Sequence, residues 1–358
     1  MFHIGAVVGE EIREGVVAGG CGALVNARPI RREPSGPSDR CRLTLPDDRV
    51  VLFDDCVVTT EQSPLLEWRR TEVSGRVASY GVGGTGPSIV FLHGWGLSGR
   101  TYKAALKRLL ALGFRVWAPA LPGFDGSSAL ASGAGDLAQY AEWVNEFLAA
   151  VGITEPVVMM GHSFGGGVAI QAAHDWPERV RGLVLINSIG GSAWRREGSL
   201  MKSIAQRPLW DWGLHFPNDV LPLRQLRRVL PVVLEAAVPN ALRDPRAFWH
   251  AATIARYADL TGELQELKAR RLPVVVLWGE RDELVTRAAF DALCESLGNP
   301  LSVTVDGSHS WLLADADTFG EVITNVILVA MSARAEAHDE QVDEIAGLEP
   351  TNGQPHAA

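Results

Sequence analysis

The stretch Gly161-His162-Ser163-Phe164-Gly165 decides how this sequence is interpreted. It lies between the apolar run Pro156–Met160, which is typical of a buried strand, and the helical pattern of Phe164–Asp175. A serine at such a junction turns the chain sharply from strand to helix, and its hydroxyl projects from the edge of the sheet. Both flanking positions favour glycine, because so tight a turn leaves no room for a side chain there. Ser163 is therefore a candidate nucleophile.

Strands and helices alternate on both sides of this turn. Short apolar runs bounded by Gly and Pro predict strands at Thr71–Tyr80, Ser88–Leu92, Phe114–Ala118, Pro156–Met160, Gly182–Ile186, Leu272–Trp278 and Leu301–Val305. Helical spacing of Leu and Ala predicts helices at Thr101–Leu112, Asp136–Val151, Phe164–Asp175, Arg287–Leu297 and Asp315–Met331. This alternation predicts an α/β fold, with a mostly parallel, doubly wound sheet that is covered by helices on both faces.

A serine attacks at neutral pH only when a base removes its proton and a third group orients that base. Asp282 and His309 each follow one of the last two predicted strands. The carboxyl ends of parallel strands lie at one edge of a sheet, so Ser163, Asp282 and His309 can converge there. Glu280 and Asp306 compete for the role of the acid, but Glu280 lies nearer its strand and Asp306 lies at a strand end. We favour Asp282.

The chain resembles the α/β-hydrolase superfamily over about Glu72–Met331. The resemblance rests on the order Ser163…Asp282…His309 and on His93-Gly94-Trp95-Gly96, which follows a predicted strand. It implies a core sheet with an inserted helical lid and a serine hydrolase of the esterase type. It also implies that no metal or other cofactor takes part.

The resemblance also implies an oxyanion hole, formed by the backbone N–H groups of Trp95 and Phe164. Such donors stabilise the charge that develops on a carbonyl oxygen during attack, and each is worth roughly 3–4 kcal/mol of the barrier. His93 and His162 stand beside the site, and we expect them to orient the backbone and fill space. The chain departs from the superfamily at Ala120, where an Asp is common. We interpret this as the loss of a structural hydrogen bond.

Charge is concentrated at the two ends of the chain. The 358 residues carry a net charge of −9, but residues 68–331 contain 25 acidic and 25 basic residues. We predict a core at 68–191 and 267–331, a helical lid at 192–266, and an acidic, disordered tail at 332–358. Residues 1–67 are an extension of undefined structure with one strand-like region at Arg49–Thr60, or the result of a start codon assigned too far upstream.

The lid segment is rich in tryptophan, since it contains Trp194, Trp210, Trp212 and Trp249. Each of these could simply pack the lid against the sheet. Together they predict an apolar roof over the site, and we take Trp194, Trp210 and Trp212 as candidate substrate contacts. An apolar or aromatic acyl group fits such a roof better than a sugar or a phosphate ester does.

Several classes of function are excluded by composition. The acidic balance and the lack of a basic stripe argue against nucleic acid, and no apolar run of 18 residues predicts a membrane span. The four cysteines lack the spacing of a zinc or redox motif, which favours reduced thiols in a cytoplasmic protein. We expect a small-molecule substrate, and a homodimer is left open.

The residues therefore predict a serine hydrolase that cleaves a carboxylic ester through an acyl-enzyme intermediate. Two alternatives remain. The same triad can hydrolyse C–C bonds or support perhydrolysis, and a receptor with little turnover can keep the same pocket.

Overall fold

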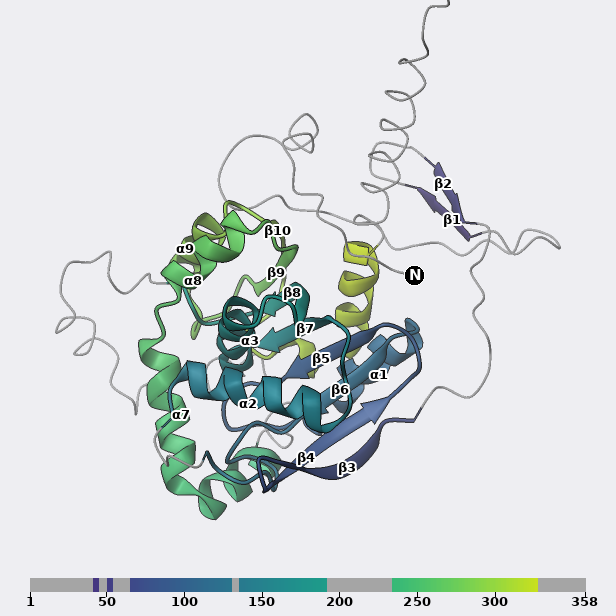
Figure 1. Ribbon diagram of the computed structural model, residues 1–358. Coiled ribbons are helices and arrows are strands. Elements are labelled where there is room, and N and C mark those ends of the chain that lie inside the picture. The colour runs from purple at the N-terminus through teal and green to yellow at the C-terminus, as the bar shows by residue number, and fades with distance from the viewer. Residues whose placement is uncertain (1–40, 45–49, 54–64, 131–134, 192–233, 328–358) are drawn as a thin grey trace, which may run out of the picture.

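A single large sheet forms the centre of the molecule. The computed structural model describes residues 41–44, 50–53, 65–130, 135–191 and 234–327. The strands of this sheet follow the order β10-β9-β8-β7-β5-β6-β4-β3 (Figure 1). Their bounds are β3 (Glu67–Val73), β4 (Arg76–Gly83), β5 (Ser88–Leu92), β6 (Arg115–Pro119), β7 (Val157–His162), β8 (Val180–Ile186), β9 (Val274–Gly279) and β10 (Leu301–Val305).

The sheet is mostly parallel, as the sequence predicts. Strand β4 runs against both of its neighbours, β3 and β6, and every other pairing in this sheet is parallel. The predicted single strand Thr71–Tyr80 is wrong, because the chain reverses within it to form the β3–β4 hairpin. Ser74 and Gly75 make that turn with φ values of 48° and 72°. A glycine in the turn makes such a reversal inexpensive.

Helices cover both faces of the sheet. They are α1 (Lys103–Ala111), α2 (Leu137–Ala150), α3 (Phe164–Asp175), α7 (Pro245–Tyr257), α8 (Thr261–Ala269), α9 (Arg287–Ser296) and α10 (Trp311–Ala314), with further helical residues at 234–243 and 316–327. The five predicted helices are all present, and their described ends differ from the prediction by at most two residues; the predicted end of the last helix, Met331, lies outside the described residues. Figure 1 shows α2 and α3 in front of the sheet.

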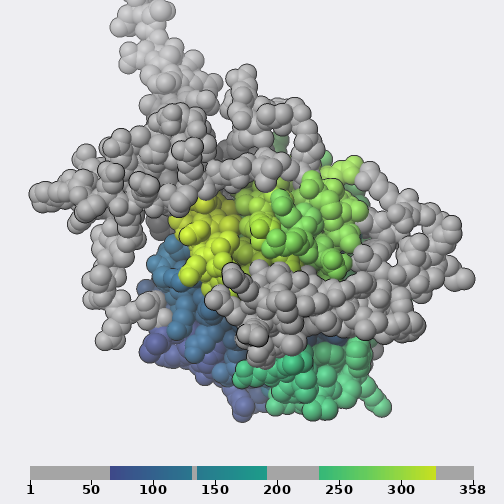
Figure 2. All heavy atoms as spheres, turned by 180° about the vertical axis from the view of Figure 1, so that it is seen from behind, coloured from purple at the N-terminus to yellow at the C-terminus, as the bar shows by residue number. Residues whose placement is uncertain are grey.

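The hydrophobic core is divided by the sheet into two clusters. Along β5, Val90 and Leu92 join the cluster under α2, α3, α8 and α9, whereas Ile89 and Phe91 join the cluster under α1 and α10. This alternation follows from the two-residue period of a strand. Helices α1 and α10 are in contact, and in the rear view the yellow part of the chain, which includes α10, lies beside the blue part (Figure 2).

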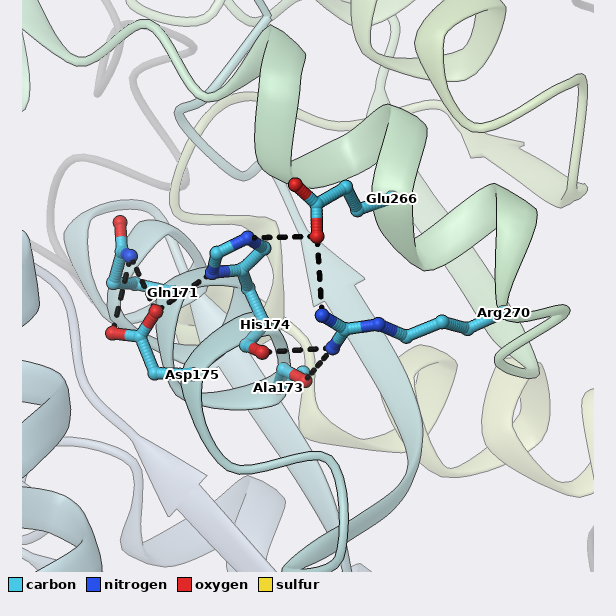
Figure 3. Close-up of polar contacts among 6 residues, drawn as sticks. All are labelled: Gln171, Ala173, His174, Asp175, Glu266 and Arg270. Atoms are coloured by element: carbon cyan, nitrogen blue, oxygen red, sulfur yellow. Dashed lines mark hydrogen bonds and ion pairs between the residues drawn. The ribbon is translucent and has the colours of Figure 1, made fainter.

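Polar contacts join the end of α3 to α8 (Figure 3). His174 pairs with Asp175 at 2.7 Å and with Glu266 at 3.2 Å, and Arg270 donates to the carbonyl of His174 at 2.7 Å. Burial lowers the pKa of His174, but its hydrogen bonds to the two carboxylates outweigh burial, so the pKa is raised. Helix α8 is therefore fixed to the body of the molecule.

The predicted lid, residues 192–266, is described from residue 234 onward. Residues 234–243 and α7 form two helices that we call the cap helices. Helix α8 packs against α3 and α9 and buries Leu264 and Leu267 in the core. The chain returns to the core just before it, where Leu260 donates to the carbonyl of Gly190 at 3.1 Å. We therefore propose that the lid ends near residue 259.

Near the ends of the chain, the structure describes only residues 41–44 and 50–53 before residue 65, and no residue after 327. Strands β1 (Cys41–Thr44) and β2 (Val50–Phe53) form a separate two-stranded antiparallel ladder. The predicted acidic tail and the lid residues Trp194, Trp210 and Trp212 lie outside the described residues. None of the described helices is both long and apolar enough to cross a membrane.

Candidate active site

Ser163 occupies a strained turn between β7 and α3. It caps α3 with φ 53° and ψ −117°, in the left-handed half of backbone space that residues other than glycine rarely adopt. Its N–H donates to the carbonyl of Ile186 on β8 at 3.0 Å, and its own carbonyl accepts from Gly166 at 2.9 Å. Such strain persists only where the surroundings enforce it, which is typical of functional sites.

The glycines on either side of Ser163 make this turn fit. A Cβ atom on Gly165 would lie 2.2 Å from the carbonyl oxygen of Leu92, and one on Gly161 would lie 2.4 Å from the carbonyl oxygen of Gly165. Both distances are far inside van der Waals contact with rigid backbone. The glycine requirement predicted from the sequence is confirmed.

Asp282 and His309 meet at the same edge of the sheet, beyond β9 and β10. His309 Nδ1 lies 2.8 Å from Asp282 Oδ2, and the Asp282 side chain is completely buried. Because a carboxylate accepts, Nδ1 carries the hydrogen and Nε2 keeps its lone pair, which is the state that a general base needs. Asp306, an alternative acid, is 79% exposed and pairs with Arg281.

The carboxylate of Asp282 is held by donors from three other residues. Its Oδ1 accepts the backbone N–H groups of Leu284 and Val285, both at 2.8 Å, and its Oδ2 accepts Nδ2 of Asn187 at 2.5 Å. Asn187 in turn accepts the indole N–H of Trp311 at 2.8 Å. The carboxylate is thus fixed toward His309.

Sequence reasoning missed Asn187. It follows β8 with φ 43°, a conformation that Asn tolerates better than most residues do. A polar residue directly after a buried strand was the available signal. Its contact with Asp282 spans 95 residues of sequence, and only the fold brings the two together.

The loop after β5 presents the backbone N–H of Trp95. The carbonyl of the preceding residue, Gly94, lies 2.9 Å from Nδ1 of His93 and accepts the N–H of Leu97 at 3.2 Å. In a trans peptide the C=O and N–H point in opposite directions, so fixing the Gly94 carbonyl fixes the Trp95 N–H. Within the described part of the chain, neither this N–H nor that of Phe164 has an acceptor.

Two buried histidines support this arrangement as neutral hydrogen-bonding groups. His162 Nε2 donates to the carbonyl of His309 at 2.9 Å, and its Nδ1 accepts the hydroxyl of Tyr102 at 2.8 Å. The hydroxyl of Tyr102 accepts the Gly94 N–H at 3.1 Å. Burial lowers the pKa of His162 to about 3, with a further contribution from the charge of His309, and burial lowers the pKa of His93 to about 4.

This chain of bonds has a clear direction. It runs from the N–H of Gly94, through Tyr102 and His162, to the carbonyl of His309, so it links the loop that carries Trp95 to the loop that carries His309. The expectation that His93 and His162 orient the backbone agrees with these contacts.

Ser163 and His309 line one cleft together with Trp95 and His162. Its walls are apolar and come from Ile189, Ala255, Ala258, Leu284, Val285 and Ala289. No Asp, Glu, Lys or Arg side chain lines it among the residues that the structure describes. Over the same residues, no group of three or more His, Cys, Asp or Glu is arranged to hold a metal ion.

Comparison with known proteins agrees with this site. Residues 89–322, well over half of the chain, match the alpha/beta hydrolase family. The chain belongs to this family. The match to the alpha/beta hydrolase family begins in β5 and extends into the helical residues 316–327, so it includes Ser163, Asp282 and His309.

The relatives that match this chain in sequence are distant. An uncharacterised protein of Mycobacterium tuberculosis is 28% identical over 288 residues, covering 73% of this chain and 80% of that protein. The pimeloyl-[acyl-carrier protein] methyl ester esterase of Aeromonas hydrophila is 29% identical over 257 residues, covering 68% and 96%. A proposed non-heme haloperoxidase of Mycobacterium phage D29 is 28% identical over 250 residues, covering 68% and 89%.

A similar fold is found in solved structures. The crystal structure of a bromoperoxidase from Bacillus anthracis matches with a TM-score of 0.59 at 20% identity, covering 73% of this chain and 99% of that chain. At this level of identity the match shows the alpha/beta hydrolase fold, and the chemistry has to be argued from the site.

Proposed function

We propose that this protein is a serine hydrolase that cleaves carboxylic esters of apolar or aromatic acyl groups. One observation carries the proposal. Ser163 stands on a strained turn in the same apolar cleft as His309, whose Nδ1 is bonded to the buried carboxylate of Asp282 at 2.8 Å. A serine, a base and an orienting acid in this arrangement are the requirements for nucleophilic attack on a carbonyl.

The proposed reaction has two stages. Ser163 Oγ attacks the carbonyl carbon while His309 Nε2 takes its proton, and the N–H groups of Trp95 and Phe164 bind the oxyanion. The intermediate collapses when His309 returns the proton to the leaving alcohol, which leaves an acyl group on Ser163. A water molecule that His309 deprotonates then releases the acid, and the serine is restored. Throughout, Asp282 orients the imidazole and stabilises its charged form.

The lining of the cleft supports an uncharged acyl group. Its aliphatic walls can remove methylene groups from water but offer no partner for a charge, and burying an unpaired charge is unfavourable. The named activity of the Aeromonas relative, on a methyl ester, is consistent with ester cleavage here. The substrate is a small molecule or a small group presented on a carrier.

A series of p-nitrophenyl esters with acyl chains of two to eight carbons tests this proposal. We expect kcat/KM to rise with chain length by up to about fourfold per methylene, which is about 0.8 kcal/mol of buried CH₂. Ser163→Ala should abolish turnover. Ser296→Ala is the matched control, because the Ser296 hydroxyl donates to the carbonyl of Ala292 within α9 and does not line the cleft. Turnover that persists in Ser163→Ala would contradict the proposal. So would a kcat/KM that does not change with the length of the acyl chain.

Perhydrolysis is a second candidate, and the likeness to a proposed haloperoxidase favours it. In this reaction hydrogen peroxide replaces water in the second stage, and the acyl group leaves as a peracid. Bromination of monochlorodimedone in the presence of acetate, bromide and hydrogen peroxide measures it, because the peracid oxidises bromide to the brominating species. An absence of ester turnover with full labelling of Ser163 by a fluorophosphonate would instead favour C–C bond hydrolysis or a receptor of low turnover.

A further inference from the structure

The cap helices rest directly on the loop that carries Trp95. Gly96 has φ 75°, and a Cβ on it would lie 3.2 Å from the ring of Phe248 in α7. The indole N–H of Trp95 donates to the carbonyl of Phe248 at 2.6 Å, and the two rings are 4.6 Å apart. Cap and loop are therefore in close contact beside the backbone N–H of Trp95.

Asn240 is the polar residue at the centre of this contact. Asn240 is almost completely buried, with 3% of its surface exposed. Its Nδ2 donates to the carbonyls of Gly96 at 3.0 Å and Leu97 at 3.4 Å, and its Oδ1 accepts the N–H of Asp125 at 2.9 Å. The orientation of the amide is fixed, because two carbonyls require the nitrogen and the N–H of Asp125 requires the oxygen. One cap side chain thus ties two core loops together.

The bond from Asn240 reaches the Trp95 N–H through two peptide groups. Asn240 holds the carbonyl of Gly96, whose peptide unit also contains the N–H of Leu97. That N–H donates to the carbonyl of Gly94 at 3.2 Å, and the Gly94 carbonyl belongs to the peptide unit that contains the N–H of Trp95. Both units are trans, so fixing one end of each fixes the direction of the other.

We infer that Asn240 is a positioning residue that makes the direction of the Trp95 N–H depend on the docking of the cap helices. The inference rests on the proposed function, in which this N–H binds the oxyanion. It adds that the cap acts on the rate of the chemical step and does more than cover the cleft. An interaction made in the transition state alone lowers kcat and leaves KM unchanged when it is lost.

Kinetics of Asn240→Asp test the inference. The aspartate keeps the acceptor for Asp125 but cannot donate to the two carbonyls. We expect kcat for the preferred ester to fall about tenfold or more, while KM changes by less than about threefold. Asn240→Ala removes both functions without adding charge, and we expect the same split. A kcat within about twofold of wild type in both variants would overturn the inference.

Asp244→Ala is the matched control for cap stability. Asp244 caps α7 by accepting the N–H of Ala247 at 2.9 Å, so its loss weakens the cap helix without removing a side-chain bond to the Trp95 loop. We expect a lower unfolding midpoint with little change in kcat. An equal fall in kcat in Asp244→Ala and in Asn240→Ala would reduce Asn240 to a structural tie and overturn the inference.

Hydrogen exchange provides a readout that needs no turnover. In both Asn240 variants we expect faster exchange at the Leu97 amide, whereas the Asp125 amide loses protection in Asn240→Ala but keeps it in Asn240→Asp. Unchanged exchange at Leu97 overturns the inference whether or not the wild type cleaves esters. Absence of wild-type ester turnover with faster Leu97 exchange would refute the proposed function alone.

Discussion

At the scale of single residues, Asn187 has the clearest untested consequence. It donates to Asp282 Oδ2 at 2.5 Å and so restrains the carboxylate that orients His309. We expect Asn187→Ala to lower kcat about tenfold, because the carboxylate gains freedom, with little change in KM. Steady-state kinetics with the preferred p-nitrophenyl ester measure this.

The chain offers a matched control for Asn187. Asn299 is also an asparagine with positive φ, 59° against 43°, but it is exposed and lies before β10, at the end opposite the site. Asn299→Ala removes the same tolerance of left-handed backbone without touching Asp282. A loss of kcat as large in Asn299→Ala as in Asn187→Ala would contradict the role assigned to Asn187.

The two buried histidines predict how stability depends on pH. Burial lowers the pKa of His162 to about 3 and that of His93 to about 4, whereas both titrate near 6.5 in the unfolded chain. Between these values the unfolded state binds more protons, so stability is full above pH 6.5 and falls as the pH drops. The expected slope is up to about 1.4 kcal/mol per pH unit for each histidine.

Urea unfolding at pH 8, 7, 6 and 5 checks this dependence. His162→Asn removes one of the two groups, so we expect its free energy of unfolding to fall less steeply than that of wild type below pH 6.5. Parallel curves for the two proteins would show that His162 does not stay neutral in the fold.

Sequence reasoning reached the candidate site only in part. Ser163, Asp282 and His309 could be placed because each follows a recognisable strand, and parallel strands bring their carboxyl ends together. Asn187 and Asn240 could not be placed, because their side-chain hydrogen bonds span 95 or more residues of sequence. Such contacts depend on loop geometry that has no local pattern.

At the scale of elements, the junction of β7 and α3 depends on its glycines. Gly165→Ala would place a methyl group 2.2 Å from the backbone carbonyl of Leu92, and we expect a loss of stability of about 3 kcal/mol or more. Gly152→Ala is the control, because Gly152 has φ 74° but open space around it. There we expect about 1–2 kcal/mol from backbone strain alone.

Thermal and urea unfolding of the two variants provide the measurement. Failure of Gly165→Ala to fold, with Gly152→Ala folded, agrees with the expectation. Equal unfolding midpoints for the two variants would contradict the expectation. They would mean that α3 moves away from β5 and makes room for the methyl group.

The order of elements could be predicted better than their pairing. Alternating strands and helices predicted the parallel sheet, since helical crossovers leave few alternatives. The alternation of apolar and polar residues continues on both sides of Ser74 and Gly75. The segment was therefore predicted as one strand, and the turn of the β3–β4 hairpin was missed. The predicted lid, residues 192–266, included most of α8, and the contacts of α8 with α3 and α9 support our proposal that the lid ends before this helix.

At the scale of the whole molecule, the described members of both hydrophobic clusters all lie between Leu66 and Val326. Residues 68–331, which include most of both clusters, contain 25 acidic and 25 basic residues, so the net charge of −9 belongs to the two ends of the sequence and carries no information about the substrate. We expect a chain of residues 65–327 to fold and to keep kcat/KM within about threefold of the full chain. Circular dichroism and ester kinetics test this, and an inactive but folded product would assign a function to the ends.

The measurement that tests the central claim most directly is the trapping of the acyl-enzyme. The full-length protein is mixed with p-nitrophenyl hexanoate and quenched in acid within the first turnovers, and the peptides are then mapped by mass spectrometry. The account predicts one hexanoyl group per chain, located on Ser163, and none in Ser163→Ala. Turnover without any acylated peptide, or an acyl group on another residue, would contradict it.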